Sequence, residues 1–112
     1  MNWIKLESIA QLEDIKSKSE DKPQIIFKHS TTCSISAMAK SRLERSWKDE
    51  EMAGADFYYL DLLSYRDISN EIADKFHVRH ESPQVIIVKG GASTYDNSHM
   101  GISYQELLSE IS

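Results

Sequence analysis

The sequence is poor in cysteine, proline and glycine: its 112 residues include one Cys, two Pro and four Gly. A single cysteine excludes an internal disulfide, and small secreted domains often carry several cysteines to supplement their core. Cys33 is therefore expected to be a free thiol in a reducing compartment. No apolar run approaches the ~18 residues of a membrane span, and the first residues show no signal-peptide pattern. We therefore expect a cytoplasmic location and no membrane partner.

Charge of one sign is not concentrated in any segment of the chain. Its 13 Lys and Arg are scattered among 18 Asp and Glu, which gives a formal net charge of −5. Nucleic-acid binding depends on clustered basic side chains that neutralise phosphates, so we expect no nucleic-acid partner. Hydrophobic residues make up 40% of the chain and charged residues 28%, as in ordinary globular proteins. At this length one compact core is expected, which predicts a single domain over residues 1–112.

Hydrophobic periodicity and turn residues predict an alternation of strands and helices. Short apolar runs bounded by Pro, Gly or Ser indicate strands, and apolar residues at 3.6-residue spacing indicate helices. Ser8, Ser64 and Ser103 stand at the capping-box distance from Gln11, Asp67 and Glu106 and predict three helix starts. The predicted order is an edge strand at 3–6, a helix at 8–19, a strand at 24–29, a helix from about Ser34 that closes by Gly54, a strand at 57–63, a helix from Ser64, a strand at 84–88, a turn at 89–91, a strand at 93–96 and a helix from Ser103.

Each helix is expected to bury one apolar stripe. The stripe of the first helix is Ile9, Leu12 and Ile15, and that of the second is Ile35, Met38, Ala39, Leu43 and Trp47. Strands separated by helices imply right-handed parallel crossovers, and the Gly-Gly hairpin adds an antiparallel strand. The expected fold class is therefore α/β, a three-layer sandwich in which helices flank a mixed central sheet. Its element order resembles that of thioredoxin.

Cys33 stands between a predicted strand that ends at His29 and a predicted helix that begins near Ser34. Its sulfur should lie among the unpaired N–H groups of a helix N-terminus, at the carboxyl end of a strand, where α/β sheets place ligand chemistry. Such a position can lower a thiol pKa from about 8.5 to roughly 3.5–7.5, and the thiolate is the form that attacks disulfides. The competing interpretation is a buried, inert cysteine that acts as a small hydrophobe. The placement of Cys33 favours a reactive thiol.

Ser36 takes the second position of a Cys-x-x-Ser sequence, where a dithiol enzyme has its resolving cysteine. After Cys33 attacks a disulfide, no internal thiol can displace the mixed disulfide, so turnover needs an external thiol. The Ser36 hydroxyl could donate a hydrogen bond to the sulfur, or could serve only as a capping group in the first helical turn. The sequence leaves these two roles open.

Pro83 directly precedes the predicted strand at 84–88. X–Pro bonds are cis in only about 5–6% of cases, so an isolated proline would be assumed trans. In this element order, however, Pro83 takes the position of the cis-proline that faces the active cysteine in thioredoxin-like proteins. With a cis bond, Ser82 could offer backbone groups to the backbone of a ligand held in a mixed disulfide, in the manner of strand addition.

Three segments of the sequence resemble one known family. They are Ser30-Thr31-Thr32-Cys33-Ser34-Ile35-Ser36, then Ser82-Pro83-Gln84-Val85, then Ser98-His99 with Gly101-Ile102 and a short final helix. Over essentially its full length the chain resembles the YtxJ family, the monothiol bacilliredoxins, and the Thr-Cys-x-Ile-Ser sequence is the most specific part of the resemblance. Members usually have Pro where this chain has Ser34, a departure that keeps the nucleophile but restores one N–H and loosens the turn.

This resemblance implies an enzyme, a thiol–disulfide oxidoreductase that reduces mixed disulfides between protein cysteines and the small thiol bacillithiol. Cys33 would be the catalytic nucleophile, bacillithiol the thiol co-substrate, and no cofactor or metal would be bound. The partners would be bacillithiolated proteins, with a low-molecular-weight thiol or another redoxin as reductant. The residues expected to contact substrate are Thr32, Ser34, Ile35, Ser36, Ser82 and Pro83, and Lys28, Arg79 and His80 are conceivable contacts for bacillithiol carboxylates.

Two other functions are weighed against this one. A monothiol glutaredoxin that binds an iron–sulfur cluster has the sequence Cys-Gly-Phe-Ser, whereas this chain has Ser34 and Ile35 at the two middle positions and its Gly-Gly pair in the hairpin turn. A noncatalytic thioredoxin-fold module that binds a partner or senses redox state through Cys33 stays open, and turnover with excess thiol would discriminate it. The four histidines share no regular metal-ligand spacing.

Overall fold

A five-stranded mixed sheet with strand order β1-β3-β2-β4-β5 forms the centre of the molecule. The computed structural model describes residues 3–112. None of its helices is long and apolar enough to cross a lipid bilayer. The elements are β1 (Ile4–Lys5), α1 (Ala10–Lys18), β2 (Gln24–His29), α2 (Ser34–Ser46), β3 (Asp56–Asp61), α3 (Arg66–Phe76), β4 (Gln84–Lys89), β5 (Ala92–Ser98), the short 3-10 helix η1 (His99–Gly101) and α4 (Tyr104–Ile111).

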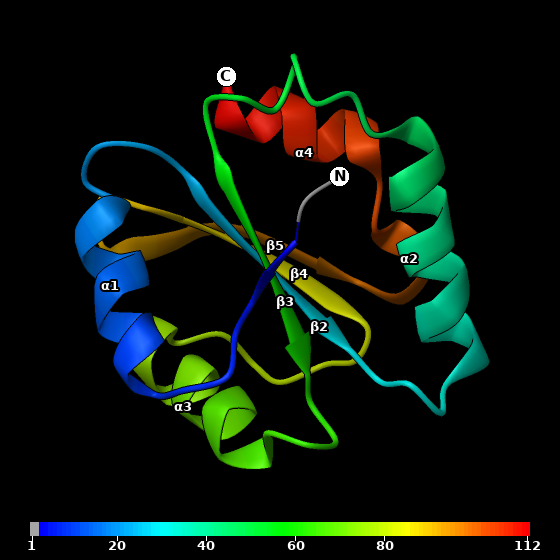
Figure 1. The fold of residues 1–112 in the computed structure, drawn as a ribbon, viewed down its shortest axis with the longest axis horizontal. Helices are drawn as coiled ribbons and strands as arrows, with labels where there is room; N and C mark the ends of the chain where they lie inside the picture. Colours follow the sequence, from blue (N-terminus) through cyan, green and yellow to red (C-terminus); the bar gives the residue numbers. More distant parts are fainter. Residues whose placement is uncertain (1–2) are drawn as a thin grey trace.

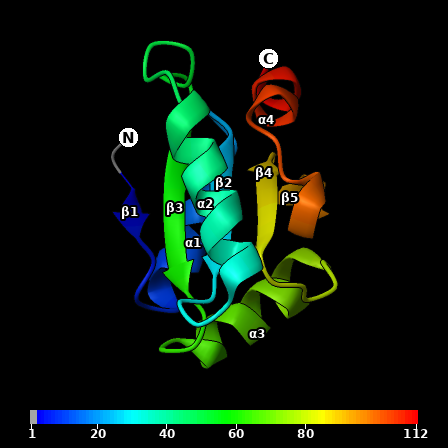
Figure 2. The same ribbon diagram turned by 90° about the vertical axis from the view of Figure 1, so that its right-hand side faces the viewer.

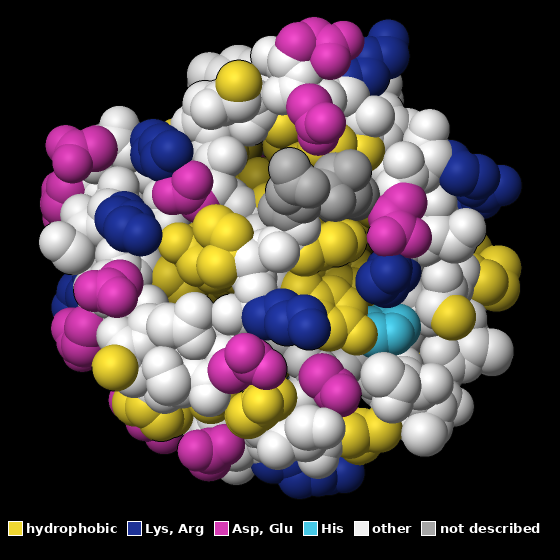
Figure 3. Space-filling view, viewed as in Figure 1, with side chains coloured by type: hydrophobic (Ala, Val, Ile, Leu, Met, Phe, Trp, Pro, Cys, Tyr) yellow, Lys and Arg dark blue, Asp and Glu magenta, His cyan; other side chains and the backbone are white. Residues whose placement is uncertain are grey.

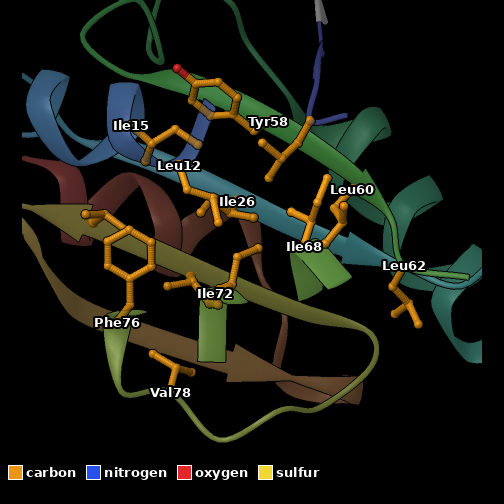
Figure 4. Close-up of a cluster of buried hydrophobic side chains, with 13 residues drawn as sticks. Leu12, Ile15, Ile26, Tyr58, Leu60, Leu62, Ile68, Ile72, Phe76 and Val78 are labelled. Carbon is orange, nitrogen blue, oxygen red and sulfur yellow. The ribbon is translucent and has the colours of Figure 1, made fainter. Parts of the chain in front are cut away.

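The sheet separates two helical layers, α1 and α3 on one face and α2 and α4 on the other (Figure 1). Each face carries its own hydrophobic core. The first core joins α1 and α3 to the sheet through Leu12, Ile15, Ile26, Ile68 and Ile72 (Figure 4). The second lies under α2 and α4 and includes Ile25, Phe27, Leu43, Val85 and Leu107. This three-layer α/β arrangement confirms the predicted fold class.

The direction of β4 differs from the sequence prediction. β1 and β2 both run parallel to β3, but β4 pairs with β2 in antiparallel register, with Lys28 opposite Gln84. The predicted parallel crossover into β4 is therefore wrong. The reason is the course of α3, which runs across the strands near the end of the sheet where β3 finishes and does not lead back to the start of β3 (Figure 2). The chain then enters β4 from the end at which it left β3.

Two of the three predicted helix starts are also wrong. Ser8 is not the N-cap of α1: Gln11 Oε1 accepts from the Ser8 N–H at 2.9 Å, as in a capping box, but the helix begins at Ala10 and its N-cap is Ile9, which has no side-chain cap. Ser64 donates from its hydroxyl to Asp61 Oδ2 at 3.1 Å, so α3 begins two residues later with Tyr65 as N-cap. Only Ser103 caps its helix, where its Oγ accepts from Glu106 N at 3.5 Å.

The second helix is shorter and more exposed than predicted. α2 ends at Ser46, because Trp47 has an extended backbone with ψ of 131°, and irregular turns lead from there to β3. Ala39 and Leu43 are buried, but Ile35 and Met38 are exposed. Ile9, predicted for the core face of the first helix, is exposed as well. Apolar spacing therefore identifies the helices correctly but overestimates the width of the buried stripe.

Candidate functional site

Cys33 is the N-cap residue of α2 and has an extended backbone, with φ of −103° and ψ of 121°. Two backbone hydrogen bonds hold it: its N–H donates to Ser30 O at 3.2 Å, and its carbonyl accepts from Ala37 N at 3.1 Å. The bond from Ala37 is the first hydrogen bond of the helix. The N–H groups of residues 34–36 therefore have no acceptor within the helix and face the N-cap. The side chain is a free thiol and is half-buried. The predicted placement of Cys33 at a strand-to-helix junction is confirmed.

Ser36 lies one turn after Cys33 and is completely buried. Its Oγ accepts from the Ser30 N–H at 3.1 Å and lies 2.6 Å from His29 Nδ1. These two bonds tie the first turn of α2 to the end of β2. The hydroxyl therefore belongs to the framework beneath Cys33, and its burial disfavours the predicted contact between Ser36 and substrate.

His29, which sequence reasoning considered only as a metal ligand, proves to be part of this framework. Its ring is buried and lies 5.6 Å from the Tyr59 ring and 6.0 Å from the Phe27 ring. Burial lowers the pKa of His29, the Lys40 ammonium lowers it further, and Asp61 and Glu44 partly oppose these effects. The ring is therefore neutral at neutral pH. Its one signal in the sequence is that it ends a buried strand four residues before the cysteine.

The loop that carries Ser82 and Pro83 lies beside the carboxyl end of β2. The register that pairs Lys28 with Gln84 places Pro83 next to His29, where the chain turns toward Cys33. The Ser82–Pro83 peptide bond is cis. Pro83 O accepts from His99 N at 3.0 Å, which fixes η1 to this loop. The structure thus brings together the two sequence segments that were predicted to form the site.

Comparison with known proteins identifies the family of this arrangement. A family model described as the monothiol bacilliredoxin BrxC matches residues 4–107. The chain belongs to the monothiol bacilliredoxin family. A solved structure described as a proposed oxidoreductase with a thioredoxin fold is 34% identical to this bacilliredoxin family member. The match spans 95% of this chain and 90% of the chain in that structure, with a TM-score of 0.78. The resemblance noted from the sequence is thereby confirmed, and the chain is a thiol–disulfide oxidoreductase of thioredoxin fold.

Structures of lower sequence identity support the fold of the bacilliredoxin chain and nothing beyond the fold. Thioredoxin from Malassezia sympodialis (Mala s 13) is 19% identical, covers 98% of this chain and 88% of its own, and has a TM-score of 0.73. Thioredoxin from Fasciola hepatica is also 19% identical, with 96% and 94% covered and a TM-score of 0.67. Both support the thioredoxin fold that the element order predicted.

Lys28 cannot contact a ligand in this bacilliredoxin, contrary to the sequence interpretation. Its side chain is completely buried on the α3 face of the sheet. Its Nζ donates to Ser69 O and to His80 Nδ1, both at 3.3 Å. Burial lowers the pKa of Lys28 to about 8, and burial together with the Lys28 ammonium lowers the pKa of His80. Arg79 and His80, the other conceivable contacts, are exposed.

Several hollows of the bacilliredoxin surface are lined by residues other than Cys33. One of about 270 Å³ is lined by residues such as Ile4, Trp47 and Phe57, and another of about 220 Å³ by residues such as Lys5 and Tyr65. Disulfide exchange needs access to one sulfur and not an enclosing cavity.

Among residues 3–112, no three His, Cys, Asp or Glu side chains converge as metal ligands. On the face shown in Figure 3, basic and acidic side chains are interspersed.

Proposed function

We propose that this bacilliredoxin reduces mixed disulfides between protein cysteines and bacillithiol, with Cys33 as the nucleophile. The observation that carries the proposal is a free, half-buried thiol at the N-cap of α2, beside the Ser82–Pro83 loop, in a chain that matches the bacilliredoxin family. The thiolate is the form of a cysteine that attacks a disulfide, and a helix N-terminus favours an anion.

The reaction takes place in two exchanges. The Cys33 thiolate attacks the bacillithiol sulfur of the substrate, a new disulfide forms between Cys33 and bacillithiol, and the protein cysteine leaves as a thiolate. An external thiol then attacks the bacillithiol sulfur of that adduct and releases the Cys33 thiolate. The second thiol must come from a low-molecular-weight thiol or another redoxin, because the chain has one cysteine.

Residues around Cys33 provide the surface for the substrate. Thr32, Ser34 and Ile35 are exposed on either side of the cysteine. We propose that they contact the mixed disulfide and that the backbone of Ser82, next to the buried Pro83, pairs with the substrate backbone. The exposed Arg79 and His80 precede Ser82 in the same loop and are available to bacillithiol carboxylates.

An apolar surface next to Cys33 supports a protein as the donor of the mixed disulfide. Ile35 and Met38 lie on α2 within five residues of Cys33, and their side chains are 43% and 53% exposed. Met100 in η1 is 61% exposed, and η1 packs against α2. We propose that these three side chains receive the polypeptide around the modified cysteine, because methionine adapts to varied apolar partners.

Replacing Met38 and Met100 with serine is expected to raise KM for a bacillithiolated protein about threefold to tenfold, because the two lost apolar contacts together contribute roughly 1 kcal/mol. The rate of Cys33 alkylation by iodoacetamide should stay unchanged, since a small reagent does not use this surface. Ile9→Ser, which removes an exposed apolar side chain on the opposite helical layer, is the matched control. An unchanged KM in the double variant would contradict the assignment of this surface.

We further propose that the chain acts as one domain over residues 1–112 in a reducing cytoplasm, with no bound cofactor. Two compact cores on one sheet and a free thiol support this proposal. Bacillithiol then serves as a co-substrate that is carried on Cys33 between the two exchanges.

The proposed specificity is tested by the initial rates of thiol release from one model protein in two forms, bacillithiolated and glutathionylated. The expected result is faster release from the bacillithiolated form, with many equivalents processed when excess thiol is present. Equal rates would contradict bacillithiol specificity. Modification of Cys33 once, without turnover, would contradict catalysis and favour a redox sensor.

A further inference from the structure

The surface of α2 changes from apolar to basic with increasing distance from Cys33. One stripe of the helix, with residues three or four apart, consists of Ile35, Met38, Arg42 and Arg45. A hollow of about 270 Å³ follows the later part of this stripe and is lined by Met38, by both arginines and by two small residues of the same helix. In Figure 2, α2 lies in front of the sheet, with no other helix or strand of the described residues over it. The hollow is therefore open to a partner.

The two arginines at this hollow have no acidic partner among residues 3–112, because none of the ion pairs formed there includes Arg42 or Arg45. Glu44, which stands between them in the sequence, accepts from Lys40 Nζ at 3.0 Å. Although the formal net charge of the chain is −5, two uncompensated positive charges thus lie side by side on α2.

The start of α4 adds positive potential next to Arg42. The half-buried Arg42 also lines a smaller hollow of about 100 Å³, together with Ser103 and Tyr104, the N-cap and the first residue of α4. A helix N-terminus carries a partial positive charge. Glu106, the carboxylate in the first turn of α4, accepts from the Tyr95 hydroxyl of β5 at 3.1 Å. The basic end of the α2 stripe therefore favours an anionic ligand.

We propose that Arg42 and Arg45 bind acidic side chains of the protein whose cysteine is modified, so that the α2 stripe selects substrates with a carboxylate-rich segment. The proposal rests on the proposed function for the protein as donor of the mixed disulfide, and it adds the class of segment that this protein carries. Arginine suits the role because its planar guanidinium binds a carboxylate through two parallel hydrogen bonds.

The length of α2 sets the place of the acidic residues in the substrate. At a rise of about 1.5 Å per residue, Arg42 lies about 13 Å along the helix from Cys33, and Arg45 about 18 Å. An extended peptide spans about 3.3 Å per residue, so the carboxylates should stand roughly four to six residues from the modified cysteine. The residues between them would pass over Ile35 and Met38.

The test uses two synthetic peptides, each with one central cysteine held in a mixed disulfide with thionitrobenzoate. One peptide carries Glu at the fourth to sixth positions on both sides of its cysteine, and the other carries Gln there. The Cys33 thiolate attacks the peptide sulfur, a disulfide forms between Cys33 and the peptide, and thionitrobenzoate leaves as a coloured thiolate. At low salt the Glu peptide should react about threefold to tenfold faster than the Gln peptide. In 1 M salt the two rates should be nearly equal, because the charges are screened.

The double variant Arg42→Gln/Arg45→Gln should bring the ratio of the two rates to about one. Its matched control, Lys16→Gln/Lys18→Gln, removes the same charge from exposed positions of α1, on the other face of the sheet, and should keep the wild-type ratio. Arg45→Gln alone, at an exposed position, should give an intermediate ratio and decides the matter if the double variant does not fold.

Three results would overturn the proposal: a wild-type ratio of one or less, a preference that survives in the arginine variants, or an equal loss in the lysine control. Since the assay contains no bacillithiol, its outcome is independent of whether the chain prefers bacillithiol to glutathione. Failure of the proposed specificity and failure of this inference are therefore distinguishable.

Discussion

Replacing Cys33 with serine is expected to reduce thiol release from a bacillithiolated protein to roughly one thousandth of the wild-type rate or less. The chain has one cysteine, and a serine hydroxyl is not ionised near neutral pH, so no nucleophile for disulfide exchange is left. The measurement is the initial rate of appearance of the substrate thiol with a fixed excess of reducing thiol.

Ser46→Ala is the matched control for this substitution, because Ser46 is exposed at the opposite end of α2 from Cys33. It should leave the rate unchanged. Cys33→Ser should also keep its fold, since sulfur and oxygen at an N-cap position both tolerate the same backbone. Release by Cys33→Ser at a substantial fraction of the wild-type rate would show that Cys33 is not the nucleophile.

The second large effect concerns the buried Lys28, whose pKa burial lowers from 10.5 to about 8. Between these two pH values the folded protein has lost the Lys28 proton while the unfolded chain still holds it. Raising the pH through this window therefore favours the folded state. The free energy of unfolding should rise by about 2 kcal/mol between pH 7 and 9.5. Urea unfolding followed by tryptophan fluorescence measures it.

The upper limit of pH 9.5 avoids the effect of two tyrosines. Burial raises the pKa of Tyr58 and of Tyr104 to about 12, so above about pH 10 the unfolded chain loses phenolic protons that the folded state keeps. Stability then falls with rising pH, opposite to the effect of Lys28.

Lys28→Met should abolish the rise in stability, because methionine fills a similar volume and has no proton to lose. The hydrogen bond from Ser69 Oγ to His80 Nδ1, at 3.3 Å, does not involve Lys28 and can persist in the variant. Lys18→Met, at an exposed position of α1, is the control and should keep the rise. A flat pH profile in the wild type would contradict the burial of a neutralisable lysine between β2 and α3.

Local signals in the sequence were sufficient for the order of the elements and for the place of Cys33. The run from Gln24 to His29 is apolar enough to indicate a buried strand, and the polar residues that follow it indicate the start of a helix. Such patterns depend on neighbours within a few residues. The same is true of the Gly90-Gly91 turn, where both glycines have positive φ, 59° and 80°.

Features that depend on which partner a side chain meets in the folded chain could not be predicted. Ser64 has the spacing of a cap, but its hydroxyl donates to Asp61 in the preceding turn. Lys28 looks like a surface charge, yet β2 lies in the middle of the sheet with helices on both faces, so all six of its residues are buried. The hydrogen bond between Ser36 and His29 joins a helix to a strand, and nothing in the local sequence distinguishes Ser36 from an ordinary cap.

The central claim is that Cys33 takes bacillithiol from a modified protein onto its own sulfur. It is tested most directly by mass spectrometry of the reduced chain after a single turnover with a bacillithiolated model protein, without added thiol. The account predicts one bacillithiol adduct, mapped to the peptide that contains Cys33, together with an equal amount of reduced substrate. An unmodified chain beside an unchanged substrate would contradict it.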